Sequence, residues 1–202
     1  MTSDLVRQWR RQERERLLAE RNSLTGSERS RLAERAIENL DRVFRKLDCS
    51  VLGLYWPIKC EIDVRHWATR VAKQSDLTLA LPVVIEKRAP LEYWQWSMGD
   101  PMARGVWNIP VPKERKPVTP DVVISPLVGF KDNYRLGYGG GFFDRTLASI
   151  QPRPYAIGIG FESFRCEDFE AEPHDIPMDI IVTEESHDVR HDGLTRSACH
   201  DG

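Results

Sequence analysis

The sequence predicts an α/β fold, in which a mostly parallel sheet is covered by helices on both faces. After residue 48, short apolar runs alternate with segments of helical periodicity. Before it, the first 46 residues contain no proline and only one glycine, Gly26, which predicts an N-terminal helical segment. The chain has 202 residues, 41% of them hydrophobic and 30% charged, so it is long and apolar enough to bury a sizeable core.

The N-terminal segment, residues 1–47, is expected to form two helices over 4–22 and 27–47. Thr25-Gly26-Ser27-Glu28 separates them, and Ser27 is a candidate cap for the second helix. The second helix has apolar residues at helical spacing, which predicts one buried face. The first helix is rich in arginine, and we expect that face to meet solvent or an anion.

The remaining elements are read from apolar runs and their proline stops. We expect strands over 51–56, 77–81, 91–97, 121–130, 155–161 and 180–182, and helices over 62–73 and 144–150. Parallel strands joined through helices predict a Rossmann-like three-layer sandwich, and ligands in such sheets bind beyond the carboxyl ends of the strands. Residues 1–185 are expected to form one domain, and the polar segment 186–202 a disordered tail.

Composition and charge exclude several classes of protein. The 29 basic and 31 acidic residues leave a formal net charge of −2, which argues against a dedicated nucleic-acid binder. No apolar run approaches the roughly 20 residues of a membrane helix, and the start of the chain has no hydrophobic signal segment. The four cysteines show no CxxC spacing, so we expect free thiols in a cytoplasmic protein.

The most informative segment is the glycine-rich stretch from Arg135 to Arg145, Arg-Leu-Gly-Tyr-Gly-Gly-Gly-Phe-Phe-Asp-Arg. It follows a predicted strand and precedes a predicted helix, so its amides are candidates for an anion-binding concavity. Arg135 could add a bidentate phosphate contact, and Asp144 could hold Mg²⁺ beside the phosphates. The stretch matches neither GxxxxGK[ST] nor GxGxxG, so a flexible structural turn remains the alternative.

In their order, these residues resemble the signature of the 5-formyltetrahydrofolate cyclo-ligase family, also called methenyltetrahydrofolate synthetase. Three other segments are similar to family segments, so the resemblance covers nearly the whole chain: Glu61-Ile-Asp63, Trp107-Asn-Ile-Pro110 and Ile176-Pro-Met-Asp-Ile-Ile-Val-Thr183. The resemblance implies an enzyme that uses ATP and Mg²⁺ to convert 5-formyltetrahydrofolate into 5,10-methenyltetrahydrofolate, with release of ADP and phosphate. The implied partners are small molecules, without nucleic acid or membrane, and the expected state is a monomer or weak homo-oligomer.

The resemblance also assigns site residues. Those implied to bind ATP are Arg10, Arg14, Arg135, Leu136, Gly137, Tyr138, Gly139, Gly140, Gly141, Phe142 and Phe143. Those implied to bind the folate are Trp56, Glu61, Trp107, Tyr138 and Phe142. The carboxylates implied to accompany Mg²⁺ are Asp144 and Asp179.

Several of these residues have a simpler structural reading. The pair Arg7 and Arg11 offers an alternative register for the basic pair, and such charged helix faces are usually solvated. Asp144 could merely complement a helix dipole. Glu61 could cap the helix expected from residue 62, and Trp56 and Trp107 could belong to the core.

The sequence also departs from the family pattern. The segment before the loop, Phe130-Lys-Asp-Asn-Tyr-Arg135, is one residue shorter and lacks a glycine, and Phe143 stands where a tyrosine is common. The alternative function is therefore a non-catalytic or altered-substrate paralogue that binds nucleotide or folate.

Overall fold

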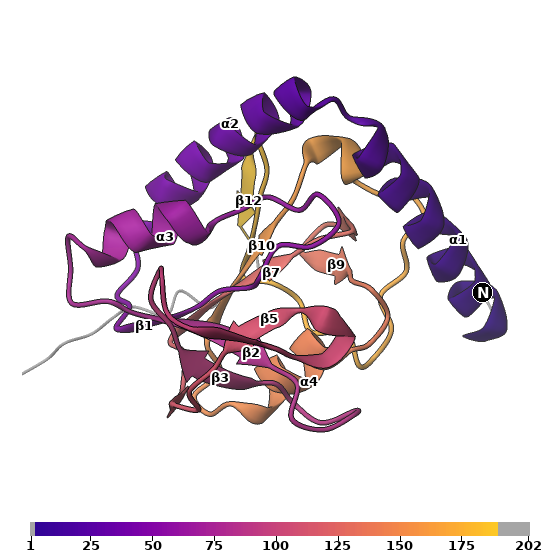
Figure 1. Ribbon diagram of the computed structural model, residues 1–202. Coiled ribbons are helices and arrows are strands. Elements are labelled where there is room, and N and C mark those ends of the chain that lie inside the picture. Colours follow the sequence, from indigo (N-terminus) through magenta and orange to yellow (C-terminus); the bar gives the residue numbers. More distant parts are fainter. Residues whose placement is uncertain (1–2, 190–202) are drawn as a thin grey trace, which may run out of the picture.

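The computed structural model describes residues 3–189, and its centre is a sheet of eight strands (Figure 1). The strand order is β12-β11-β10-β7-β1-β2-β3-β6. The five central strands are mutually parallel, whereas β3, β6 and β12 pair antiparallel at the edges, which confirms the mostly parallel sheet. The strand bounds are Val51–Gly53 (β1), Thr78–Val83 (β2), Glu92–Gln95 (β3), Pro117–Val118 (β6), Val122–Pro126 (β7), Tyr155–Ile159 (β10), Ile180–Val182 (β11) and His187–Val189 (β12).

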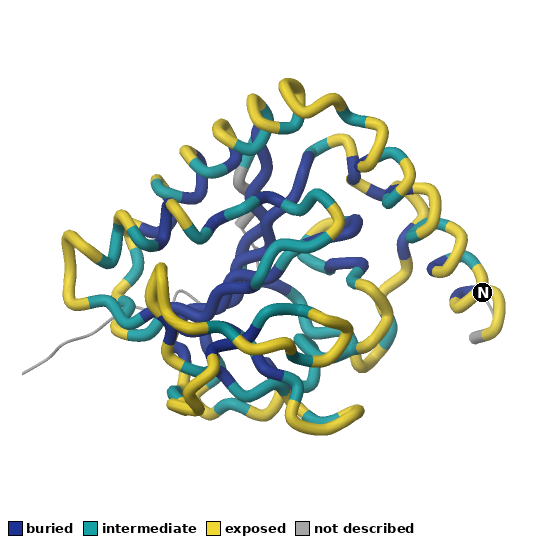
Figure 2. The backbone as a smooth tube through the Cα atoms, viewed as in Figure 1, coloured by how far each residue is buried: buried dark blue, intermediate teal, exposed yellow. Residues whose placement is uncertain are grey.

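Helices cover both faces of this sheet. Alternate residues of the central strands belong to two separate apolar clusters: Val122 and Ile124 face one cluster, and Val123 faces the other. The first cluster includes residues of α1 (Ser3–Ser23), α2 (Gly26–Phe44) and α3 (Arg65–Ala72), and the second includes Leu147 of α4 (Phe142–Ser149). Figure 2 shows the buried strands running between these layers. The predicted three-layer arrangement is therefore confirmed.

The N-terminal helices form as predicted, but the cap of the second is Thr25 rather than Ser27. Thr25 has extended backbone angles (φ −62°, ψ 155°), and its hydroxyl accepts a hydrogen bond from the Glu28 amide at 3.2 Å. The Glu28 carboxylate accepts in return from the Thr25 amide at 3.1 Å. This reciprocal capping box satisfies two amides, so the helix starts one residue earlier than expected.

The inner face of α1 is less solvated than its arginine content suggested. Arg10 is 6% exposed, Leu17 0% and Arg21 2%. These residues repeat at helical spacing, so two buried guanidinium groups flank the apolar residue that fixes the helix to the core.

The apolar run at 121–130 divides into two strands that belong to different sheets. β7 ends at Pro126, and β8 (Gly129–Lys131) pairs instead with β9 (Tyr134–Leu136) in an antiparallel hairpin. Asp132 turns this hairpin with a φ of +50°. The hairpin thereby delivers the chain to the start of the glycine-rich loop.

Other bounds differ from the sequence expectation for local reasons. β2 continues through Pro82, although proline has no amide hydrogen to donate to a neighbouring strand. β1 pairs only with residues 78–80 of β2, so on the β1 side no strand lies beside Pro82. α4 begins two residues earlier than expected, since Gly141 adopts a left-handed conformation and ends the loop there. The expected helix over 62–73 shortens to α3, and β1 and β10 are shorter than their apolar runs.

Two further segments escaped the sequence analysis. β4 (Met102–Arg104) and β5 (Pro110–Pro112) form a hairpin, with the 3-10 turn η1 (Val106–Asn108) between them. The start of the expected disordered tail is also ordered, since residues 187–189 form β12 against β11; residues 190–202 lie outside the described part. Between residues 3 and 189, no helix is long and apolar enough to cross a membrane.

Candidate functional site

A cavity of about 1120 Å³ opens beyond the carboxyl ends of β1, β2 and β7. This is the edge of the sheet at which open α/β folds bind ligands. α1, the glycine-rich loop, the β4–β5 hairpin and the segment at 172–175 complete its walls. Of the residues predicted for the site, it brings together Arg10, Arg14, Trp56, Glu61, Trp107, Arg135, Gly137, Tyr138, Gly139, Gly140, Gly141, Phe142, Phe143 and Asp144.

The glycine-rich loop has the geometry of an anion-binding turn. Gly139 has a φ of +89° and Gly141 one of +63°, conformations that L side chains rarely adopt. Arg14 Nε donates to the Gly137 carbonyl at 2.6 Å, and Arg145 Nη2 donates to the Gly140 carbonyl at 2.6 Å. Within the described chain, no group accepts a hydrogen bond from the amides of 137–141. Two loop carbonyls are thus bound by arginine side chains, and the loop amides remain available to an anion.

Two arginines of α1 line the cavity, but only Arg14 contacts the glycine-rich loop. Arg14 lies against Gly139, and the pKa of its guanidinium is lowered by burial and by the charge of Arg10. Arg10 donates to the carboxylate of Asp175 and to the Glu170 carbonyl, so it ties α1 to the segment before β11. Arg11 points to solvent and pairs with Glu15. The structure therefore favours the register of Arg10 and Arg14 over that of Arg7 and Arg11, although Arg7 also lines the cavity.

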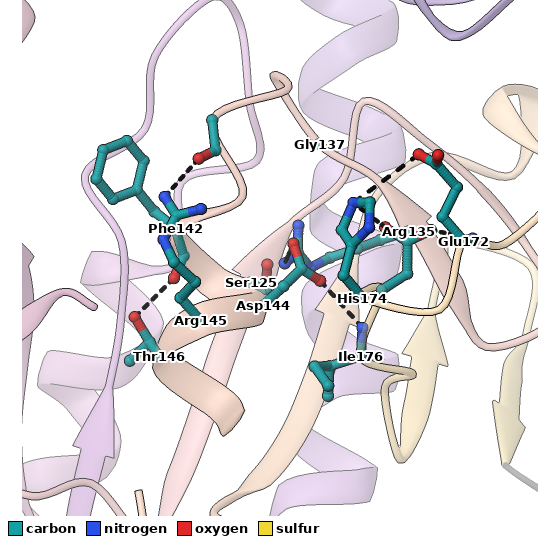
Figure 3. A network of polar contacts seen from close by, with 12 residues as sticks. Ser125, Arg135, Gly137, Phe142, Asp144, Arg145, Thr146, Glu172, His174 and Ile176 are labelled. Carbon is teal, nitrogen blue, oxygen red and sulfur yellow. Dashed lines mark hydrogen bonds and ion pairs between the residues drawn. The ribbon is translucent and has the colours of Figure 1, made fainter. Parts of the chain in front are cut away.

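Arg135 and Asp144 form a buried ion pair at the base of the loop (Figure 3). The Arg135 Nη2 and Asp144 Oδ2 atoms are 3.0 Å apart, and the Asp144 Oδ1 atom accepts from the Ile176 amide at 3.2 Å. The Arg135 side chain is 6% exposed. Apart from the ion pair, its Nε and Nη2 atoms donate no hydrogen bond to any of the described residues. Its guanidinium lies over the Phe143 ring at 5.2 Å. Arg135 thus retains donor capacity in a cavity wall, as expected of an anion ligand.

The donor set suits Mg²⁺ only together with a nucleotide. Mg²⁺ in phosphoryl-transfer sites usually takes one or two carboxylates plus substrate phosphates. Asp144 supplies one carboxylate beside the loop, in the first turn of α4, where it also complements the helix dipole. Among residues 3–189, no three acidic, histidine or cysteine side chains are arranged to hold a metal alone.

Asp179 lies away from the cavity. Its carboxylate accepts from Arg153 Nη1 at 2.9 Å and from the Ala156 amide at 2.7 Å, at the amino ends of β10 and β11. Because these strands are parallel to β7, that edge is opposite the cavity. The structure therefore does not bring Asp179 to Asp144, and the expectation that they accompany one Mg²⁺ fails on geometry.

We expect Asp179→Asn to weaken the fold and leave catalysis intact. Loss of charge weakens the contacts to Arg153 and the Ala156 amide, at a cost of about 1–3 kcal/mol in the free energy of unfolding. Urea denaturation would measure this cost. A Mg²⁺ titration of turnover would check the second part, and a shifted Mg²⁺ requirement would return Asp179 to the metal site.

Glu61 marks the other end of the cavity. Its Oε1 atom accepts from the Tyr138 hydroxyl at 2.8 Å, and its Oε2 atom accepts from the Ile58 amide at 2.8 Å. Burial raises the pKa of Glu61, and these hydrogen bonds oppose that rise. Glu61 does not cap α3, which starts only at Arg65. It instead joins the glycine-rich loop to the segment that follows β1.

Two tryptophans also line the cavity. Trp107 is 67% exposed with a φ of +56°, and its ring meets Phe142 edge to face at 5.6 Å. Trp107 is thus no core residue and presents an aromatic face at the mouth of the cavity. Trp56 is half-buried and packs against the core, and the Arg65 guanidinium covers it at 3.9 Å.

Some lining residues were missed, and Leu136, like Asp179, is a predicted site residue that lies outside the cavity lining. Leu136 is fully buried and supports the loop from below, outside the cavity lining. Arg145, which holds the Gly140 carbonyl, could have been found from its position one turn into α4. Other missed residues include Tyr55 and Lys59, which are neighbours of the predicted Trp56 and Glu61 in the sequence. Glu172, His174 and Asp175 had no local motif, because the fold brings their segment to the cavity from elsewhere in the chain.

These features define an α/β protein in which a glycine-rich loop with unpaired amides shares one cavity with aromatic side chains and a buried carboxylate. Comparison with known proteins identifies it further. The family model for the 5-formyltetrahydrofolate cyclo-ligase family matches residues 6–184, and the chain belongs to this family of enzymes. The resemblance seen in the sequence is thereby confirmed.

One curated relative and one solved structure match most of the chain, and another relative matches about a third of it. A protein named 5-formyltetrahydrofolate cyclo-ligase from Mycoplasma pneumoniae is 30% identical over 174 residues, which cover 85% of this chain and 96% of the relative. One of the same name from Escherichia coli strain K12 is 44% identical over 66 residues, 31% of this chain and 36% of the relative. The solved structure of Aquifex aeolicus 5,10-methenyltetrahydrofolate synthetase has a TM-score of 0.77 at 29% identity, covering 95% of this chain and 99% of that one.

Proposed function

We propose that the protein converts 5-formyltetrahydrofolate into 5,10-methenyltetrahydrofolate at the expense of ATP, with Mg²⁺ bound alongside the nucleotide. Family membership and the names of the relatives support the reaction. One observation carries the assignment to this site: the glycine-rich loop, whose amides are unpaired, and Glu61 line a single cavity. A triphosphate and a flat, polar ring can therefore be held side by side.

The two ends of the cavity suit the two substrates. At the phosphate end, the loop amides, Arg14 and Arg135 supply donors to the triphosphate. At the ring end, Glu61 can accept hydrogen bonds from the pterin amine, and Trp107 offers an aromatic face. Tyr138 belongs to both ends, because its backbone lies in the loop and its hydroxyl binds Glu61.

The chemistry requires activation of an inert oxygen. The formyl oxygen attacks the γ-phosphorus of ATP and displaces ADP. Folate N10 then attacks the activated carbon and loses its proton, and the formyl oxygen departs as part of phosphate. Bound Mg²⁺ would neutralise phosphate charge during the transfer.

The chain contributes mainly placement and charge. Arg135 and Arg14 are fixed, partly desolvated cations, so they stabilise negative charge without first having to reorganise. Walls of aromatic side chains, such as Phe142 and Phe143, exclude water from the transferred group. Holding both substrates in one cavity makes the transfer effectively intramolecular.

An assay of both products tests this proposal. Purified protein incubated with ATP, Mg²⁺ and 5-formyltetrahydrofolate should form methenyltetrahydrofolate and ADP in equal amounts. The same mixture without ATP should form neither. Calorimetric binding of ATP or folate without turnover would contradict the proposal and favour the non-catalytic paralogue. ADP release with another reduced folate only would favour an altered substrate, for which Phe143 is the first residue to examine.

The compartment follows from the same chemistry. We infer a cytoplasmic location, because ATP and reduced folates are substrates of reducing compartments and the described cysteines Cys49, Cys60 and Cys166 are free thiols. A monomeric or weakly oligomeric state stays a prediction.

A further inference from the structure

Arg21, near the end of α1, is a buried cation that the proposed site does not yet use. It is 2% exposed, and its Nε and Nη2 atoms make no hydrogen bond within residues 3–189. Its guanidinium lies 5.8 Å from the ring of Phe164, and none of the described carboxylates pairs with it directly. Burying a charge without a partner is costly, so a favourable field at Arg21 must offset part of that cost.

The position of Arg21 relates it to the cavity. It follows Arg14 by seven residues and Arg10 by eleven, so the three arginines share one face of α1. Arg21 does not line the cavity and lies behind its wall. There its charge acts on Glu61 and Tyr138: burial raises the pKa of both groups, and Arg21 opposes that rise. Arg21 thus acts on the Glu61 carboxylate, which the Tyr138 hydroxyl also binds.

We propose that Arg21 is a positioning residue, an inference that rests on the proposed function. From behind the wall, its guanidinium keeps Glu61 as a carboxylate and the Tyr138 hydroxyl directed toward it. Glu61 can then accept hydrogen bonds from the amine of the folate ring, and Tyr138 holds the glycine-rich loop against the ring end.

The other charges around Glu61 do not replace Arg21. Lys59 also favours the carboxylate, but it is exposed and its field is screened by water. Tyr138 and Tyr55 are neutral hydroxyls whose own pKa values are raised, first by burial and then by the charge of Glu61. Burial raises the pKa of Glu61, and Arg21 is the buried cation that opposes this rise. Without Arg21, Glu61 should take up its proton at a higher pH.

Arg21→Gln and Arg21→Lys test the inference. In the pH profile of kcat/KM for 5-formyltetrahydrofolate, the acidic limb is the range in which activity falls as the pH is lowered. In Arg21→Gln this limb should shift to higher pH by about one unit, because a cation that favours the carboxylate is gone. On the acidic side this shift lowers kcat/KM on the order of tenfold. Arg21→Lys keeps the charge and should retain a limb close to that of the wild type. The KM for ATP should be unchanged in both variants.

Two controls separate positioning from stability. Glu61→Gln removes the titrating group, so its limb should disappear and Arg21→Gln should have no further effect on the pH profile. Leu17→Ala, one turn earlier on the same buried face, should lower the melting temperature without moving the limb. Coincident limbs for Arg21→Gln and Arg21→Lys would overturn the proposal. If Arg21→Gln does not fold, Glu61→Gln decides, since a limb that survives this substitution also overturns it.

The experiment can fail separately from the proposed function. If the wild type does not turn over the folate, the reaction assignment is lost, yet the charge state of Glu61 is still measurable. A ¹³C NMR titration of the Glu61 carboxyl should show a higher pKa in Arg21→Gln than in the wild type. Equal values would refute the role of Arg21 whatever reaction the site performs.

Discussion

Asp144→Asn is expected to lower kcat about 10²–10³-fold, because it removes the carboxylate that helps to hold the Mg²⁺ that neutralises the phosphate charge. The amide has the shape of the carboxylate, so the loop and α4 should keep their places. Asparagine is a poor ligand for the Mg²⁺ that accompanies the nucleotide, and a higher Mg²⁺ concentration should be needed for half-maximal turnover. Steady-state kinetics at several Mg²⁺ concentrations would measure both effects.

Stability complicates this variant, and Asp179→Asn is its matched control. Asp144→Asn also leaves the buried Arg135 guanidinium without its carboxylate, so the melting temperature should fall. Asp179→Asn breaks a comparable ion pair with Arg153 at the opposite edge of the sheet. Assayed well below both melting temperatures, only Asp144→Asn should lose turnover. Equal activity in the two variants would mean that Asp144 only completes the first turn of α4.

The strands of the parallel core could be predicted because each is buried on both faces. The run at 180–182 is Ile-Ile-Val, and the structure places a strand over those residues. β4, β5 and β6 could not be predicted in this way. They are two or three residues long, and Pro110, Pro112 and Pro117 occupy positions in them where a strand interior would disfavour proline. Their pairing depends on neighbours supplied by the tertiary fold.

The glycine-rich loop could be predicted because its residues are contiguous in the sequence. Carboxylates from elsewhere are harder to place, as Asp175 and Asp179 illustrate. Asp179 directly precedes a strand parallel to β7, so it must lie at the amino edge, opposite the ligand edge. Asp175 lies four residues earlier, and the loop carries it back to the cavity, where it binds Arg10. Only the path of that loop distinguishes the two, and no local pattern encodes it.

The arginines of α1 show a similar limit. Their helical spacing was visible, but a face with many arginines and glutamates usually meets solvent. Arg11 and Arg16 follow that rule, with partners on the same helix. Arg10 and Arg21 do not, because this face of α1 packs against the body of the protein, where Leu17 joins the core and Arg10 lines the cavity.

Gly139→Ala is expected to lower kcat/KM for ATP about 10²-fold, since a small displacement of a positioning loop is costly in catalysis. The residue has a φ of +89°, and a Cβ atom there would lie 3.3 Å from Cζ of Arg14. The new methyl group would strain the turn and push away the arginine that binds the Gly137 carbonyl. Loop amides and Arg14 would then both lose their placement on the triphosphate.

Gly99→Ala controls for the backbone strain in this variant. Gly99 has a similar φ of +99°, its Cβ atom would meet nothing within 4 Å, and it lies outside the cavity lining. Both alanines should therefore lower the melting temperature, because a left-handed residue with a side chain costs about 1–2 kcal/mol in the free energy of unfolding. Only Gly139→Ala should weaken the use of ATP. If both variants keep the same kcat/KM, the loop does not bind the phosphates, and the nucleotide must be sought along another wall of the cavity.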